Sequence, residues 1–107
     1  MADYTIKAGD AGSVIEAVLK ENAAEVDLTG ASVRFLMSDA QYGASKVNAP
    51  ATIVTAAAGA VAYDWQPGDL DTAGGFLAEF EVTFADGSIA TFPSAGYVEI
   101  RVIGDLN

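Results

Sequence analysis

The stretch GFLAEFEVTFA, residues 75–85, decides the fold class of this chain. Phenylalanine, alanine or valine stands at every even position from 76 to 84, whereas the odd positions between them carry leucine, glutamate and threonine. Because successive side chains of a strand point to opposite faces, this alternation predicts a strand with one face in the core. Asp86-Gly87 follows, a pair suited to the positive φ angles of a two-residue type I′ turn. The sequence therefore predicts a hairpin whose second strand covers residues 88–92 and places Ile89 opposite Phe84.

The same alternation predicts further strands on both sides of this hairpin. Apolar residues alternate with small or polar ones over residues 32–37, 60–65 and 97–103, and shorter strands are indicated at 4–8 and 51–55. Pro93 ends the strand 88–92 because proline cannot donate a ladder hydrogen bond, and residues 94–96 supply the next loop. The three alanines before Gly59 are too few to nucleate a helix, which predicts a tight connection.

Residues 13–20 allow two interpretations. Apolar side chains alternate from Ile15 to Leu19 as in a strand, whereas Ser13 and Glu16 have the spacing of a helix capping box. We favour the strand, because the β-branched pair Val14-Ile15 and the β-rich surroundings suit it.

Seven or eight short strands, spaced about 10 to 15 residues apart with Gly, Pro or Asp between them, predict an antiparallel β-sandwich. Residues 21–27 are expected as an acidic loop closed by Leu28-Thr29-Gly30, and residues 39–50 as a polar, mobile loop. No long helical segment is predicted that could cross over a parallel sheet. We therefore expect one domain spanning residues 1–107.

The composition of the 107 residues excludes several classes of function. Hydrophobic residues make up 51% and charged residues 19%, which excludes intrinsic disorder. Fifteen acidic residues against five basic ones give a net charge of −10, which argues against binding to nucleic acid or anionic lipid. The chain has no His and no Cys, which removes disulfides, thiolate zinc sites, cysteine nucleophiles and the usual neutral-pH general base. No apolar run reaches the roughly 18 residues of a membrane helix and the first residues lack signal-peptide features, so we expect a mature, soluble intracellular product.

Three carboxylates, Asp64, Asp69 and Asp71, lie around the turn sequence Pro67-Gly68. Oxygen ligands this close in sequence could hold calcium. Their spacing matches no EF-hand loop, however, and aspartate is common in Pro-Gly turns because its side chain bonds nearby backbone amides. We therefore interpret them as turn residues and as the weak metal candidates of the chain, and we predict no cofactor.

Paired carboxylates are a second candidate site. Glu79 and Glu81 share a strand face about 7 Å apart, and two such groups act as acid and base in glycoside hydrolysis. No cleft is implied beside them, so we interpret them as solvated residues of an outer face and predict no enzyme activity.

Most aromatic side chains are expected in the core, because they fall on the inward faces of the predicted strands. These are Phe35, Tyr63, Trp65, Phe76, Phe80 and Phe84. Trp65 lies next to a turn and is the one expected to be partly exposed and to contact a partner. Tyr4 and Tyr42, in edge or loop positions, are weaker interface candidates.

Four segments in this order resemble a known family: DLTGASVRF (27–35), AGAVAYDW (58–65), DTAGGFLAEFEV (71–82), and Asp86-Gly87 followed by TFP (91–93). Over roughly residues 14–103 they are similar to the N-terminal domain of phage baseplate upper proteins. The resemblance implies an immunoglobulin-like antiparallel β-sandwich of seven to eight strands. It implies scaffold roles as well, with Gly30 and Gly59 at positive φ before strands, and no catalytic site.

The function implied by the resemblance is that of a non-enzymatic structural protein of a phage virion, made in the host bacterial cytoplasm. Its expected partners are other particle proteins (tail hub, baseplate or capsid), with no nucleic acid and no membrane, and self-association as a homo-oligomer stays open. In that family the domain joins a receptor-binding fibre to the tail hub. No stalk or fibre sequence follows before Asn107, which raises the alternative of a capsid decoration or head–tail accessory protein.

An alternative from another class is a carbohydrate- or calcium-binding β-sandwich module. It would use Trp65 as a stacking platform and Asp64, Asp69 and Asp71 as ligands.

Overall fold

The computed structural model describes residues 4–9, 12–93 and 97–104, which contain ten strands and one turn of 3-10 helix. They are β1 (Tyr4–Lys7), β2 (Val14–Val18), β3 (Lys20–Glu21), β4 (Ala24–Glu25), β5 (Ser32–Asp39), β6 (Ser45–Thr55), η1 (Ala56–Ala58), β7 (Ala60–Asp64), β8 (Gly74–Thr83), β9 (Ile89–Phe92) and β10 (Val98–Ile103). No helix in these ranges is long and apolar enough to cross a membrane.

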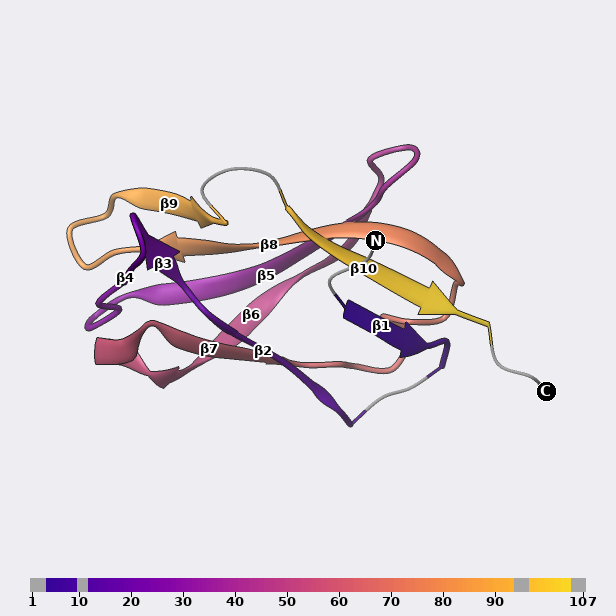
Figure 1. Ribbon diagram of the computed structural model, residues 1–107, viewed down its shortest axis with the longest axis horizontal. Helices are drawn as coiled ribbons and strands as arrows, with labels where there is room; N and C mark the ends of the chain where they lie inside the picture. Colours follow the sequence, from indigo (N-terminus) through magenta and orange to yellow (C-terminus); the bar gives the residue numbers. More distant parts are fainter. Residues whose placement is uncertain (1–3, 10–11, 94–96, 105–107) are drawn as a thin grey trace.

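Strand β6 joins the two layers of the sandwich. Its first part, up to Ala51, pairs with β5, whereas its second part, from Thr52, pairs with β7. The strand order is β1-β10-β8-β5-β6-β7-β2, and β9 pairs with β8 beyond the end of β10 (Figure 1). The pairs are antiparallel apart from β1 and β10, which run parallel.

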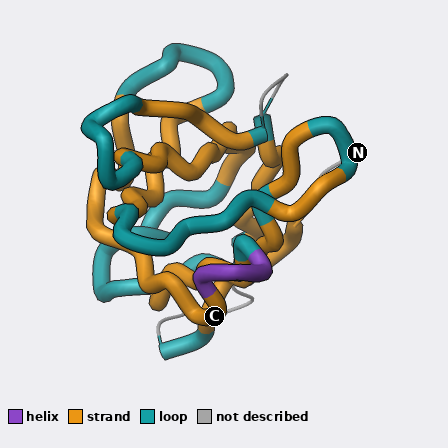
Figure 2. Tube along the Cα trace, turned by 90° about the vertical axis from the view of Figure 1, so that its left-hand side faces the viewer, coloured by secondary structure: helices purple, strands orange, loops and turns teal. Residues whose placement is uncertain are grey.

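The alternating residues of β5 and β8 build the core. Phe35 of β5 stands opposite Phe80 of β8, with ring centroids 5.2 Å apart. From the other layer, Tyr63 of β7 stacks on Phe35 at 4.6 Å. Each such aromatic pair contributes about 0.5–1.5 kcal/mol beyond the area that it buries. The strands therefore close around one aromatic centre. Figure 2 shows the arrangement of the strands viewed along the long axis of the molecule.

The strands predicted from alternation are confirmed. Residues 32–37, 60–65, 75–85 and 97–103 correspond to β5, β7, β8 and β10, with shifts of one or two residues at their ends. The first strand is β1, and residues 14–18 form the strand β2 rather than the alternative helix. The tight connection before β7 is the single turn η1, ended by Gly59 at φ +69°. The loop expected at residues 94–96 lies outside the described residues, and the β-sandwich class is confirmed.

The loop predicted over residues 39–50 is too long, because only residues 40–44 lie between β5 and β6. Strand β6 begins at Ser45, and Val47 is buried opposite Met37 of β5. Arg34 fastens the pairing by donating from Nε to Asn48 Oδ1 at 2.8 Å and from Nη2 to the Asn48 backbone oxygen at 3.0 Å. Val47 is the only large apolar residue in this half of β6, so the alternation there has too little contrast to predict a strand.

The predicted register of the β8–β9 hairpin is also wrong. Thr83, not Phe84, stands opposite Ile89. Gly87 alone among the turn residues has a positive φ, +88°, and its N–H donates to the Phe84 oxygen at 2.9 Å. These features are typical of a three-residue loop with a glycine bulge. A shift of one residue turns every side chain to the other face, and Ile89 is accordingly 64% exposed.

A two-residue turn occurs instead within residues 21–27, which were expected as an acidic loop. Lys20–Glu21 and Ala24–Glu25 pair as β3 and β4. Asn22 and Ala23, the two residues between them, have φ +53° and +67°. A type I′ turn requires positive φ at both central positions. The sequence concealed this turn because alanine stands where glycine is usual.

Candidate interaction surface

Apolar side chains gather on the outer face of the layer formed by β5, β8 and β10. Leu36 and Leu77 are half-buried there, and Tyr97 is 55% exposed. The register brings them together, because Leu36 stands opposite Glu79 and Leu77 is two residues away on the same face of β8. With Glu79, they line a shallow hollow of about 300 Å³ whose further wall is the base of the β5–β6 loop.

Tyr42 lies in that loop, residues 40–44, which projects from the body of the molecule (Figure 1). The Oδ1 atom of Asp39 accepts hydrogen bonds from the backbone N–H groups of Gln41 and Tyr42, both at 2.8 Å. The N–H of Asp39 donates to the Ala44 oxygen at 2.9 Å. The backbone is thus fixed while the Tyr42 side chain is 79% exposed, which lowers the entropic cost of binding through it.

We call this region the tyrosine face. It consists of Leu36, Tyr42, Leu77, Glu79 and Tyr97.

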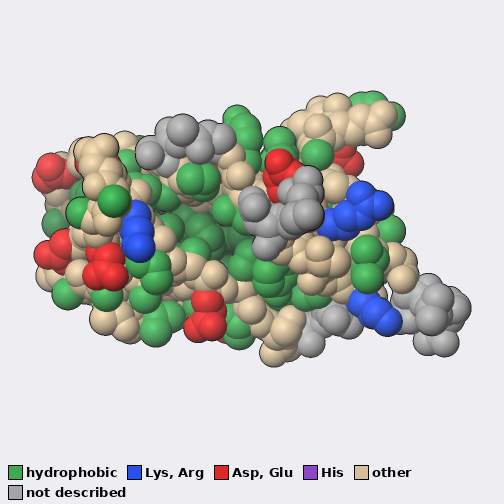
Figure 3. Space-filling model, in the orientation of Figure 1, with side chains coloured by type: hydrophobic (Ala, Val, Ile, Leu, Met, Phe, Trp, Pro, Cys, Tyr) green, Lys and Arg blue, Asp and Glu red, His purple; other side chains and the backbone are tan. Residues whose placement is uncertain are grey.

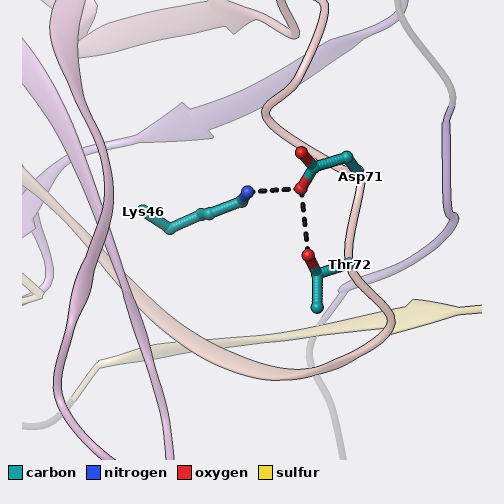
Figure 4. Close-up of polar contacts among 3 residues, drawn as sticks. All are labelled: Lys46, Asp71 and Thr72. Carbon is teal, nitrogen blue, oxygen red and sulfur yellow. Dashed lines mark hydrogen bonds and ion pairs between the residues drawn. The ribbon is translucent and has the colours of Figure 1, made fainter.

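A polar bridge fastens the start of β6 beside this loop (Figure 4). The Lys46 ammonium forms an ion pair with Asp71 Oδ1, which also accepts a hydrogen bond from Thr72 Oγ1 at 3.0 Å. The bond from Lys46, followed by that from Thr72, lowers the pKa of Asp71 below its ordinary value. Because Asp71 is exposed, we expect the bridge to position the two segments more than to stabilise the fold.

Trp65 is buried, which corrects the expectation that it would be partly exposed and contact a partner. Its side chain is 1% exposed. Its ring meets Phe35 and Tyr63 edge-on, with centroids 5.5 Å apart in both pairs. Its Nε1 donates to Tyr4 Oη at 3.4 Å. Trp65 follows the end of β7, yet it keeps the inward phase of Tyr63 and belongs to the core. Tyr4 is half-buried against it, and an interface role for Tyr4 stays a prediction.

The three aspartates proposed as metal candidates have separate surroundings. Asp69 Oδ2 accepts hydrogen bonds from Tyr63 Oη at 2.5 Å and from the Gln66 N–H at 2.9 Å. Asp71 binds Lys46, and Asp64 is exposed at the end of β7. Burial, followed by the bond to Asp69, raises the pKa of Tyr63 above its ordinary value. Within the described ranges, no three acidic side chains form a group that could hold a metal ion.

The paired glutamates lie in different surroundings. Glu79 lines the hollow of the tyrosine face, whereas Glu81 stands opposite Arg34 of β5.

The sequence singled out Tyr42 but missed Leu36, Leu77 and Tyr97. Each of the three is an apolar residue at a position that the alternation assigns to the outer face of its predicted strand. An apolar residue at such a position is the sequence signal that could have indicated the surface. Only the pairing of β5, β8 and β10, which are distant in sequence, shows that the three residues share one place.

These residues lie on a β-sandwich, a scaffold that many unrelated functions share. Residues 2–92 match the family model of the BppU N-terminal domain, and the chain belongs to this family. The family domain is a structural component of the phage baseplate, so the protein is part of the phage virion. The match begins before the expected residue 14, includes β1, and ends before β10.

The fold also resembles a solved structure. The crystal structure of CopC from Methylosinus trichosporium OB3b is similar with a TM-score of 0.57 and 18% sequence identity, over 100% of this chain and 89% of that chain. At this identity the likeness shows the fold alone. No match is found among curated proteins.

Proposed function

We propose that the protein is a tail or baseplate component that docks onto neighbouring proteins of the particle through the tyrosine face. The observation that carries this proposal is the family match over residues 2–92. A structural component of a particle must hold its neighbours. The docking requires contact area and complementary charge, and no catalytic group.

The tyrosine face has the composition of an interface core. Tyrosine is enriched among the side chains that dominate binding energy, and Tyr42 and Tyr97 are both more than half exposed. Leu36 and Leu77 add apolar area beside Tyr97, and the fixed β5–β6 loop, whose base borders the same hollow, sets the position of Tyr42. Glu79 gives the hollow a negative charge, and the whole chain carries −10. We therefore expect a partner surface with aromatic or apolar side chains and basic residues beside them.

The two alternatives differ in what supports them. A capsid decoration or head–tail accessory protein could use the same face, and its position in the particle distinguishes it. The carbohydrate- or calcium-binding module has less support, because Trp65 is buried and Asp69 and Asp71 are bound to Tyr63 and Lys46.

Cryo-electron microscopy of purified phage particles tests the position. Density for this sandwich at the tail tip supports the proposal, whereas density on the capsomers supports the decoration alternative. Absence of the chain from purified particles contradicts both.

Substitutions on the tyrosine face test the surface separately. We expect Tyr42→Ala and Tyr97→Ala each to lower incorporation into particles about tenfold or more, as loss of a central interface tyrosine does. Ile89→Ala is the matched control, because Ile89 is also an exposed apolar residue but lies at the start of β9. Normal incorporation of a Tyr42→Ala/Tyr97→Ala double variant would reject this face and leave the baseplate position untouched.

A further inference from the structure

Strand β2 is the last strand of the sheet, and one of its edges is unpaired in the described part of the chain. The backbone hydrogen bonds on its paired side show which residues direct their N–H and C=O groups toward β7. Trp65 N–H donates to the Ser13 oxygen at 3.0 Å, and Leu19 N–H donates to the Gly59 oxygen at 2.8 Å. The odd-numbered residues of β2 therefore direct their backbone groups toward β7.

The even-numbered residues of β2 direct their backbone N–H and C=O groups to the unpaired edge, because these groups alternate along an antiparallel strand. Glu16 and Val18 are two of them. The edge continues to Lys20. The Leu19 oxygen accepts a hydrogen bond from Val26 N–H at 2.9 Å and so points to the same side as the Leu19 N–H. The backbone groups of the next residue, Lys20, therefore point to the unpaired side. The unpaired edge thus offers the backbone groups of Glu16, Val18 and Lys20.

The side chains along this edge have a self-complementary pattern. Glu16, Val18 and Lys20 are all exposed, with Val18 at 49%. Neither Glu16 nor Lys20 forms an ion pair within the ranges that the structure describes. One negative and one positive charge therefore lie at equal distances from a central apolar residue.

We propose that β2 pairs antiparallel with β2 of a second copy of this chain, about a two-fold axis at Val18. Val18 then stands opposite the partner's Val18, and each Glu16 stands opposite the partner's Lys20. Every one of these positions belongs to the outward-facing set, so each facing pair can exchange two backbone hydrogen bonds. This pairing is independent of where in the particle the protein lies.

Other registers of the same edge are unfavourable. An axis at Glu16 places glutamate opposite glutamate, and an axis at Lys20 places lysine opposite lysine. An axis midway between Glu16 and Val18 places each charge opposite a valine. Opposite charges facing across strands stabilise the pair, and like charges destabilise it, so the register centred on Val18 is favoured.

An apolar groove runs beside this edge. It has a volume of about 360 Å³, and green side chains line a hollow on the face seen in Figure 3. Its lining includes Ala17, Leu19, Phe80, Phe92, Pro93 and Val98. A second copy on β2 would cover one rim of the groove and remove apolar surface from water, which favours association. It would also occupy a strand edge that otherwise invites unspecific pairing.

Charge exchange at the edge tests the proposal by sedimentation velocity at micromolar to millimolar concentration. The wild-type chain is expected to reach the mass of two chains as concentration rises. Glu16→Lys and Lys20→Glu are each expected to remain single chains, because each variant brings like charges face to face. An equimolar mixture of the two variants, and the double variant Glu16→Lys/Lys20→Glu, restore opposite pairs and are expected to regain the dimer.

This design separates edge pairing from general charge repulsion. Glu16→Lys makes the chain less acidic and Lys20→Glu makes it more acidic, so repulsion alone predicts opposite effects whereas edge pairing predicts loss in both. Asp64→Lys is the matched control, because it changes the net charge as Glu16→Lys does but lies on β7. It should leave the dimer intact.

A second variant tests the backbone bonds. Val18→Pro removes an N–H that points away from β7, so the thermal transition should remain and the dimer should be lost. Wild-type chains that remain single at all concentrations would overturn the proposal. Dimers that survive both single charge reversals, or a mixture that does not recover, would overturn it equally.

Discussion

The buried hydroxyl of Tyr63 links the aromatic centre of the protein to the turn after β7. The ring of Tyr63 stacks on Phe35, whereas its Oη donates to Asp69 Oδ2 at 2.5 Å. Asp69 in turn accepts the N–H of Gln66 and so closes the turn. Tyr63 therefore packs in the core through its ring and bonds the turn through its hydroxyl. The Asp69 carboxylate is the acceptor that joins the two, so its role is structural.

Tyr63→Phe should lower the free energy of unfolding at pH 7 by about 1.5 kcal/mol, the usual size of a lost hydrogen bond to a charged group. The raised pKa of Tyr63 also gives this difference a pH dependence. Above pH 10, the ordinary pKa of a tyrosine side chain, the unfolded chain releases the phenolic proton while the folded chain keeps it. The contribution of Tyr63 is therefore complete below pH 10 and is lost as the pH rises further.

Urea unfolding of both proteins at pH 7 and at several values above pH 10 measures this effect. The wild-type advantage over Tyr63→Phe should shrink with rising pH. A difference that stays constant across this range would show that the Tyr63 proton does not stabilise the fold.

Ala23 carries a positive φ of +67°, which costs a residue with a Cβ about 1–2 kcal/mol. Ala23→Gly should therefore raise the free energy of unfolding by about 1 kcal/mol, despite the added flexibility of the unfolded chain. Ala24→Gly is the neighbouring control, since Ala24 lies on β4 without a positive φ and should lose stability. Thermal melts of the two variants should move in opposite directions, and a lower melting temperature for Ala23→Gly would contradict the reason given.

At the scale of elements, Gly59 is where η1, β7 and the end of β2 meet. Its φ is +69°, and a Cβ added there would lie 2.7 Å from the Leu19 oxygen and 2.9 Å from the Val26 oxygen. Both are backbone atoms in paired segments, so they cannot move aside without breaking bonds. The positive φ of this glycine and the close approach of the backbones have one origin, the tight turn before β7.

Gly59→Ala should cost about 3 kcal/mol, since the left-handed backbone and the overpacking act together. Gly87→Ala is the control for the backbone term alone, because Gly87 has φ +88° but nothing lies within 4 Å of its added Cβ. We expect Gly87→Ala to cost about 1 kcal/mol. Chemical denaturation measures the free energy of unfolding of both variants. Equal losses of stability would mean that the close contact with Leu19 and Val26 adds nothing to the cost of Gly59→Ala.

The elements that could be predicted from the sequence are those with strong contrast between their two faces. Strand β8 alternates phenylalanine with glutamate, and β10 alternates isoleucine and valine with charged residues. The first half of β6 has only Val47 among small and polar residues, and its pairing with β5 holds it as a strand. The β3–β4 hairpin is held by a turn that lacks the usual glycine. The first error arose where tertiary pairing, rather than local pattern, decides the structure, and the second where a turn forms without its usual residue.

At the scale of the whole molecule, the candidate site was less predictable than the strands. Tyr42 could be identified because a loop tyrosine is exposed wherever the strands lie. The contribution of Leu36, Leu77 and Tyr97 depends on the order β10-β8-β5 in the sheet, which no local pattern contains. The same dependence misled the prediction for Trp65, whose burial follows from rings on β5 and β7 meeting it from two sides.

The net charge of −10 acts over the whole molecule and gives the docking proposal a measurable dependence on salt. If basic partner surfaces attract this charge, rebinding of the chain to particles that lack it should weaken as salt rises from about 50 to about 500 mM, because the screening length shortens from more than 10 Å to a few ångströms. Glu79→Gln, within the tyrosine face, should reduce the salt dependence, whereas Glu21→Gln, on the β3–β4 hairpin, should not. Affinity that is indifferent to salt in all three proteins would make the contact mainly apolar, and the charge would then serve to keep the unassembled protein soluble.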